Sequence, residues 1–305
     1  MRKNRKNCIA LGCLLLAIGC WLGGCQSENS NIQIPALATR QVTDDLGRRV
    51  KIPEKVERAV SLAPNLTEII FAVDAGGKLV GDTTYCDYPA AAQKIQKIGD
   101  TLNPNIEAII ALKPQVVFVS TASQIETFTR TLEQQNIAVF ITNPKNLDGV
   151  YQSIFQIGEI LDRSEKANEI VGEMKRRASD VKEQTRASNR VKTFVQISRE
   201  PLFTIGKDSF ITDLIERAGG ASVTANVPEA YPKFSKETAL ALQPEAIILS
   251  DSPDDLEPND VFKNSPAVKN GRVFKISADL LSRPSPRIID ALEQIARDLH
   301  PESFR

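Results

Sequence analysis

The chain has 305 residues, and its basic and acidic side chains balance at 38 each. This balance argues against a nucleic-acid-binding surface, which needs an excess of Lys and Arg. The only histidine, His300, stands in the last six residues, which weakens both His-based catalysis and zinc or manganese sites built from several imidazoles. No phosphate-binding loop is present. Neither an enzyme nor a bound cofactor is therefore expected.

The first 24 residues are typical of an export signal. Four basic residues between Arg2 and Lys6 precede an apolar run from Cys8 to Trp21 that is too short to span a membrane comfortably. The run ends in LGGC at 22–25, which resembles the lipobox of bacterial lipoproteins. We therefore expect cleavage before Cys25, a lipid on its thiol, and a protein anchored to the outer face of a membrane. A plain signal peptide and modification at Cys20 are the alternatives.

Cleavage at this point changes the composition of the exported chain. Cys25 and Cys86 are then the only cysteines, so no disulfide framework is expected. Loss of four basic residues leaves 34 against 38 acidic ones, a net charge of about −4, which argues against binding an anionic membrane surface by charge. The 281 residues that remain after removal of the first 24 are enough for one large or two medium domains.

Strand and helix signals alternate along the rest of the chain. A polar linker at 25–40 leads to a hairpin, with strands at 40–43 and 49–52 around a turn at 44–47. Further strands are expected at 59–62, 116–119, 138–141, 193–197, 247–249 and 273–276, and helices at 65–74, 124–135 and 209–218. This alternation predicts an α/β protein with mostly parallel sheets.

An internal repeat connects the two halves of the chain. Residues 107–120 recur at 237–250, a constant offset of 130 residues, with five of 14 positions identical. The identical pairs are Glu107/Glu237, Ala111/Ala241, Leu112/Leu242, Pro114/Pro244 and Ser120/Ser250. Each copy reads as a short helix, a proline and a buried strand, so the repeat predicts two lobes of one topology. Two ordinary helix–strand units within one sheet are the alternative.

A long amphipathic segment lies between the two copies. Apolar residues follow helical spacing from 165 to about 186, and Ser164 is the expected cap. Such a helix is roughly 33 Å long and would connect two lobes stiffly, allowing small rocking rather than wide closure. The expected organisation is a signal peptide at 1–24, the linker at 25–40, an N-terminal lobe at 41–163, a connecting helix at 164–189 and a C-terminal lobe at 190–305.

Several motifs in both halves carry a family resemblance. They are RAVSLAPNLTE at 58–68, YCDYP at 85–89, KIGD at 97–100, PLFTIGK at 201–207, YPKFS at 231–235 and SRPSPRII at 282–289. In this order they resemble the substrate-binding proteins of cobalamin and iron-siderophore ABC importers, and the last three resemble the cobalamin branch in particular. The resemblance covers residues 40 to 300. It implies two α/β lobes joined by one long backbone helix, with the ligand cleft between the lobes.

The resemblance also implies which residues contact the ligand: Tyr85, Tyr231, Arg283, Asp279 and Phe203. Aromatic walls with a few hydrogen-bond donors suit a corrin ring, which offers a broad apolar face edged with amides. Arg283 could also meet the phosphate of the nucleotide loop. For the tyrosines and the arginine the alternative is structural, namely core tyrosines with a satisfied hydroxyl and a surface arginine.

One departure from the family concerns the ligand. Cobalamin-binding relatives often line the cleft with tryptophans, but the mature chain has none, and Leu280 and Leu281 stand where an aromatic residue is expected. The expected ligand is cobalamin or a related corrinoid, with a ferric siderophore or haem as the alternatives. Cys86 either ligates a metal or acts as a small buried hydrophobic residue, and the second reading is preferred.

Glu107 and Glu237 match the docking glutamates of the family, one per lobe, which pair with arginines on the membrane permease. Charge pairs at such a rim steer docking and set its register. The alternative is a helix acid, because each follows a capping residue, Asn105 or Ser235, by two positions. The implied partners are an ABC permease dimer with its ATPase subunits and, through the lipid, the membrane. We expect a monomeric binding component; a lipid-anchored enzyme and an adhesion or sensor lipoprotein are the alternatives.

Overall fold

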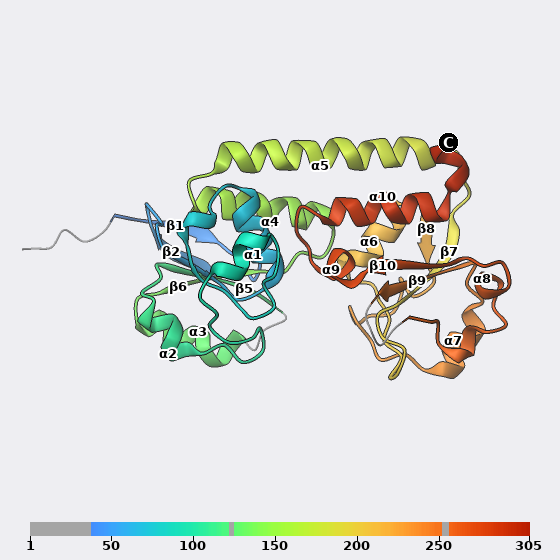
Figure 1. The fold of residues 1–305 in the computed structure, drawn as a ribbon, viewed down its shortest axis with the longest axis horizontal. Helices are drawn as coiled ribbons and strands as arrows, with labels where there is room; N and C mark the ends of the chain where they lie inside the picture. Colours follow the sequence, from blue (N-terminus) through green and yellow to red (C-terminus); the bar gives the residue numbers. More distant parts are fainter. Residues whose placement is uncertain (1–37, 122–124, 252–255) are drawn as a thin grey trace, which may run out of the picture. The chain divides into compact units, whose positions relative to one another are not determined.

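Figure 1 shows a computed structural model of the chain, which describes residues 38–121, 125–251 and 256–305. The predicted signal peptide, Cys25 and most of the linker lie outside these residues. Residues 37 to 305 form one compact unit. In the described part of the chain, no helix has the length and apolar character needed to cross a bilayer.

Each half of this unit is built on a four-stranded parallel sheet. The first contains β3 (Ala59–Ser61), β4 (Leu79–Gly81), β5 (Val116–Ser120) and β6 (Ala138–Thr142), in the order β4-β3-β5-β6. The second contains β7 (Val191–Gln196), β8 (Gly220–Ser222), β9 (Ala246–Asp251) and β10 (Val273–Ser277), in the order β10-β9-β7-β8. Read from the opposite edge, the second order matches the first strand for strand. The structure therefore confirms two α/β lobes of one topology.

The sequence repeat corresponds to one helix–strand unit used twice. Helix α2 (Ile106–Ala111) precedes β5, and α7 (Lys236–Leu242) precedes β9. The side chain of Asn105 caps α2 and that of Ser235 caps α7. Both units then turn through a left-handed residue at equivalent positions, Lys113 with φ 48° and Gln243 with φ 43°. The two copies thus share their caps and their backbone turn as well as their residues.

The remaining helices cover the two sheets. They are α1 (Pro64–Ala72), α3 (Ile125–Gln134) and α4 (Leu147–Ile160) in the first lobe, and α6 (Phe210–Arg217), α8 (Pro266–Lys269), α9 (Ala278–Ser282) and α10 (Ile288–Leu299) in the second. A small antiparallel hairpin of β1 (Thr39–Thr43) and β2 (Arg49–Pro53) precedes the first sheet. Every strand predicted from the sequence, and each of the helices predicted at 65–74, 124–135 and 209–218, is present within two residues of its expected bounds.

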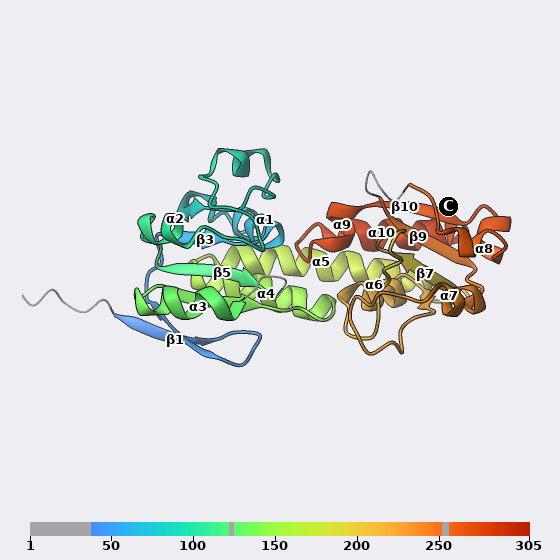
Figure 2. The ribbon, with the colours of Figure 1, turned by 90° about the horizontal axis from the view of Figure 1, so that it is seen from below.

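A single long helix, α5 (Ser164–Thr185), connects the lobes (Figures 1 and 2). It packs on α4 of the first lobe and on α10 of the second, through a buried stripe that includes Ala167, Val171 and Met174. The expected cap was wrong by one residue: Arg163 is the N-cap and makes no side-chain capping bond, so Ser164 begins the helix. The predicted fold class, two parallel-sheet lobes joined by one backbone helix, is confirmed.

The hydrophobic core is continuous between the two lobes on the side of α5. One continuous cluster of buried residues runs from Ile52 and Phe118 in the first lobe, through Val171 of α5, to Ile248 and Leu292 in the second. Two smaller clusters, on the faces of the sheets away from α5, each belong to one lobe only. The lobes therefore share a core on the α5 side and have separate cores on the opposite side.

Candidate functional site

A cleft of about 620 Å³ is lined by both lobes. The residues at or just beyond the carboxyl ends of β5, β6, β7 and β9 contribute to it, namely Ser120, Asn143, Ile197 and Ser250. Ser120 and Ser250 are the last identical pair of the repeat. In open α/β sheets, ligands bind outside the carboxyl ends of the strands. The topology therefore makes this cleft the candidate binding site.

Two tyrosines stand on its walls. Tyr85, 60 % exposed, comes from the loop after β4, and Tyr231, 45 % exposed, comes from the loop before α7. Exposed aromatic rings of this size are unusual in a folded protein unless they serve an interface or a ligand. Burial raises the pKa of the Tyr231 phenol, and a hydrogen bond with the Ser209 side chain acts in the opposite direction.

Arg283 and Asp279 also line the cleft, and they pair with each other. The Arg283 side chain is only 12 % exposed, and its guanidinium contacts Asp279 Oδ1 at 2.6 Å, Asp87 Oδ1 at 2.7 Å and Glu68 Oε1 at 3.2 Å. Burial works to raise the pKa of Asp87, but the hydrogen bond and charge of Arg283 outweigh it and the pKa lies below its usual range. The positive charge of Arg283 is thus already balanced by the protein.

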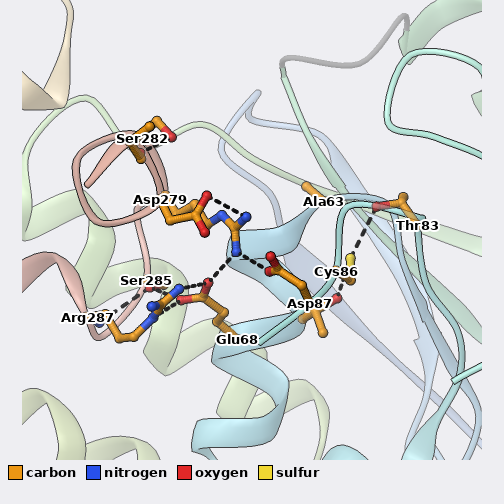
Figure 3. Close-up of polar contacts among 12 residues, drawn as sticks. Ala63, Glu68, Thr83, Cys86, Asp87, Asp279, Ser282, Ser285 and Arg287 are labelled. Carbon is orange, nitrogen blue, oxygen red and sulfur yellow. Dashed lines mark hydrogen bonds and ion pairs between the residues drawn. The ribbon is translucent and has the colours of Figure 1, made fainter. Parts of the chain in front are cut away.

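These contacts belong to a cluster that connects the lobes (Figure 3). Glu68, in α1, is buried and accepts hydrogen bonds from Ser285 Oγ at 2.6 Å and from Arg287 Nε at 2.9 Å. The Arg287 guanidinium also lies over the ring of Tyr88, 3.9 Å from its centroid. Carboxylates and an aromatic ring of the first lobe therefore meet two arginines from the segment between α9 and α10.

Sequence reasoning assigned no role to Glu68, Ser285 or Arg287, although each lies in a motif that carries the resemblance. One signal was available. In the sequence, Glu68 directly precedes the apolar run of residues 69–73, and in the structure every residue of α1 from 65 to 70 is buried. A carboxylate in such a position requires partners.

Lys97 fixes the loop that carries Tyr85, Asp87 and Tyr88. Lys97 Nζ donates to Asp82 Oδ1 at 2.8 Å, to the Cys86 carbonyl at 2.9 Å and to the Ala92 carbonyl at 3.2 Å. Asp82 is fully buried, and this burial raises the pKa of its carboxyl to about 6 despite the nearby ammonium. The loop is therefore fixed by one lysine that bridges a carboxylate and two backbone carbonyls.

Cys86 is buried next to the exposed Tyr85. The hydroxyls of Thr67 and Thr83 lie 3.1 and 3.2 Å from its sulfur, and burial raises the pKa of the thiol. Among the described residues, no group of three or more His, Cys, Asp or Glu side chains could hold a metal ion. The surroundings of Cys86 are those of a small buried residue, as preferred from the sequence.

Three other residues singled out in the sequence lie away from the cleft. Phe203 is half-buried, and its backbone bridges to Ser198 and Lys233. Leu281 is part of the shared core, and Leu280 packs against it. The positions 280 and 281, where an aromatic residue was expected, are therefore not among the residues that line the cleft.

The two glutamates of the repeat occupy equivalent places. Glu107 and Glu237 are both exposed, in the first turns of α2 and α7. Figure 1 shows these two helices on the same side of the molecule, opposite α5 and α10. Glu237 accepts a hydrogen bond from Ser235 Oγ at 2.8 Å, which lowers the pKa of its carboxyl.

The profile of the periplasmic binding protein family matches residues 60–280. This chain belongs to that family. Its members are solute carriers rather than enzymes, so the predicted absence of catalysis and the predicted family are both confirmed. The two-lobe fold and the cleft found above are those of substrate-binding proteins that serve importers.

Individual relatives extend this result. An ABC transporter substrate-binding lipoprotein of Bacillus subtilis, YvrC, is 29 % identical over 97 % of this chain and 96 % of its own length. The crystal structure of the periplasmic vitamin B12-binding protein BtuF of Vibrio cholerae superposes with a TM-score of 0.74 at 28 % identity, covering 83 % of this chain and all of that one. The periplasmic haem-binding protein RhuT of Roseiflexus shares the fold, with a TM-score of 0.72 at 22 % identity over 81 % of this chain and 99 % of its own.

Proposed function

We propose that this protein is the lipid-anchored substrate-binding component of an ABC importer and that it carries cobalamin or a related corrinoid to the permease. The observation that carries the proposal is the cleft at the carboxyl ends of both sheets, with an exposed tyrosine on each wall. The similarity to vitamin B12-binding proteins over about four-fifths of the chain supports this ligand class.

The chemistry of the cleft fits a large ligand with an apolar face and a neutral polar edge. Tyr85 and Tyr231 offer aromatic surface for the face of a corrin ring. Short polar side chains such as Asn65, Thr121 and Asn143 lie on the same walls and suit its amides. Because carboxylates already neutralise Arg283, this wall favours a neutral hydrogen-bonding edge over an anionic group.

Ligand titration tests this assignment. The purified mature chain is titrated with cyanocobalamin, a ferric hydroxamate siderophore and haem, with the absorbance of each ligand as the readout. We expect saturable binding of cyanocobalamin that weakens on the order of tenfold or more in Tyr85→Ala and in Tyr231→Ala, because each variant removes an aromatic surface that the ligand would cover. Leu46→Ala, at an exposed apolar residue of the hairpin turn, is the matched control. Saturable binding of only an iron complex would exclude the corrinoid.

Glu107 and Glu237 are the proposed contacts to the permease. They are exposed acids at equivalent positions of the two lobes, on one side of the protein. The double reversal Glu107→Lys with Glu237→Lys should abolish uptake in cells while leaving ligand affinity unchanged, because charge pairs at a rim control association. Glu165→Lys is the matched control, since Glu165 is also an exposed acid in the first turn of a helix, α5, on the opposite side. Retained uptake in the double variant would contradict the docking role.

The anchor is proposed from the sequence of residues 22–25 and from the lipoprotein relative. The sequence predicts a linker after Cys25, most of which lies outside the described residues. A linker of about 15 residues has a typical reach of roughly 20 Å, which would keep the binding protein close to a permease in the same membrane and raise its effective concentration there. Cys25→Ser should move the protein from the membrane fraction to the soluble fraction. A protein that stays with the membrane in this variant would show that Cys25 is not its anchor.

A further inference from the structure

Glu68 is a buried acid whose partners all come from the other lobe. Its side chain is 2 % exposed, and in the described part of the chain its side-chain hydrogen bonds and ion pairs all come from Arg283, Ser285 and Arg287. An isolated buried carboxylate is strongly unfavourable. The N-terminal lobe therefore places in its own helix a charge that only the C-terminal lobe can satisfy.

The geometry of this contact is specific. Arg287 approaches with two nitrogens, Nε to Oε2 and Nη2 to Oε1 of Glu68, the bidentate arrangement that fixes orientation as well as distance. Ser285 adds a third donor at 2.6 Å. The stack of Arg287 on Tyr88 holds the same guanidinium from its face. Few relative positions of the two lobes can satisfy all of these contacts together.

The same carboxylate reaches the wall of the cleft. Arg283, which lines the cleft, shares Oε1 of Glu68 with Arg287. Its other two partners, Asp87 and Asp279, are about half exposed, at 54 % and 46 %, where ion pairs are weak and flexible. Glu68 is thus the one buried anchor of the Arg283 guanidinium.

We propose that Glu68 is a positioning residue: it holds the two lobes at one spacing and fixes Arg283 on the cleft wall, without itself contacting the ligand. The consequence for binding rests on the function proposed above. If the lobes are always at the spacing that binds the ligand, the protein shows its full intrinsic affinity. If only a fraction of the molecules has this spacing, the apparent affinity is reduced in proportion to that fraction.

The test compares Glu68→Gln with the wild type. Gln keeps the shape of the side chain but removes its negative charge and replaces one of its two acceptor oxygens with an NH2 donor, so Arg283 and Arg287 lose the carboxylate that they share. The inter-lobe distance in the ligand-free mature chain is measured by pulsed electron–electron double resonance. The spin labels are attached at Lys94→Cys and Lys263→Cys, which are exposed positions in the two lobes. The labels are introduced in a Cys25→Ser background, because the free thiol of Cys25 would otherwise also be labelled, and the buried Cys86 stays unlabelled. In Glu68→Gln we expect the inter-lobe distances to be longer and more broadly distributed than in the wild type. We also expect its affinity for cyanocobalamin to be about tenfold lower. The melting temperature of each protein is recorded in parallel.

A second contact between the lobes supplies the matched control. Arg217 of α6 pairs with Asp148 of α4 at 2.7 Å, with Asp148 68 % exposed, and neither residue lines the cleft. Asp148→Asn should leave both the distance distribution and the affinity unchanged.

An unchanged distance distribution in Glu68→Gln would overturn the proposal, even if the variant were less stable, because a merely structural acid would lower stability alone. The same broadening in Asp148→Asn would also overturn it. If Glu68→Gln does not fold, the double variant Glu68→Gln with Arg287→Gln removes both members of the pair and should show the same broadening. Failure of the wild type to bind cyanocobalamin would reject the ligand, while the distance measurement would still decide the role of Glu68.

Discussion

The two lobes repeat one scaffold but differ in the segments that face each other. The N-terminal lobe has its long insertion after β4, where residues 82–105 carry Tyr85, Asp87 and Tyr88 before α2 begins. The C-terminal lobe has its long insertion after β10, where α9 and residues 283–287 precede α10, whereas the first lobe passes from β6 to α4 in four residues. The repeated elements build the frame and place one tyrosine in equivalent loops, Tyr85 after β4 and Tyr231 after β8, whereas the segment between β10 and α10 adds the pair Asp279 and Arg283.

The two lobes are also complementary in charge where they meet. The N-terminal lobe contributes Glu68 and Asp87, and the C-terminal lobe contributes Arg283 and Arg287. Such a division makes the contact between the lobes specific, because like charges would meet if either lobe were paired with a copy of itself. It also means that neither lobe contains a complete binding wall.

The largest effect is expected from the shared core. Phe118 of β5 is fully buried, packs edge-on against Phe140 at 6.0 Å between ring centroids, and belongs to the cluster that continues into the second lobe. Phe118→Ala should lower the free energy of unfolding by about 3–5 kcal/mol. Because the core is continuous, urea denaturation followed by circular dichroism should retain one cooperative transition. Two separate transitions would show that the lobes unfold independently, as separate domains.

The repeated scaffold was largely predictable from the sequence. The pattern at 107–120 and 237–250 identified α2, β5, α7 and β9 because each unit follows a local rule, with a cap, an apolar helix, a proline and a buried strand. The edge strands β4 and β8 were missed, since each has only three residues and one of them is a glycine. Helix α10 was missed because its first two residues, at 288 and 289, were assigned to the SRPSPRII motif that carries the family resemblance.

The cleft was predictable only in part. Tyr85, Tyr231, Asp279 and Arg283 lie on its walls, but they came from the resemblance and not from local pattern. The bond from Arg287 to Glu68 joins residues 219 positions apart, and no periodicity within one chain relates positions so distant. The one local sign of such a partner in the sequence was the position of Glu68 directly before the apolar run of residues 69–73.

A smaller effect concerns two acids of the loop 82–105, whose contributions to the stability of the fold change with pH in opposite directions. Burial raises the pKa of Asp82 to about 6 in the folded protein, so the folded state binds this proton more tightly than the unfolded chain. Stability from this group is then present at low pH and is lost as the pH rises from about 4 to about 6, by on the order of 1–3 kcal/mol. Asp87, whose pKa is lowered, contributes stability that is lost as the pH falls below its unfolded value.

Urea denaturation of the wild type and of Asp82→Asn between pH 4 and 7 measures this effect. The difference in free energy between the two proteins should change across this window and become constant above it. A difference that is independent of pH would show that Asp82 is ionised in the folded protein throughout, and that Lys97 outweighs its burial.

The smallest effect compares the two copies of the repeat directly. Lys113 and Gln243 both adopt positive φ at the turn between helix and strand, a conformation that costs a non-glycine residue roughly 1 kcal/mol. Lys113→Gly should therefore stabilise the protein by about 0.5–1 kcal/mol, since glycine adopts this turn without strain. Gln243→Gly should gain less, because the Gln243 side chain donates a hydrogen bond to the Leu240 carbonyl at 2.8 Å that glycine loses. Thermal denaturation of both variants measures the difference, and a larger gain at Gln243 than at Lys113 would mean that the two turns are strained to different degrees despite their matching backbone.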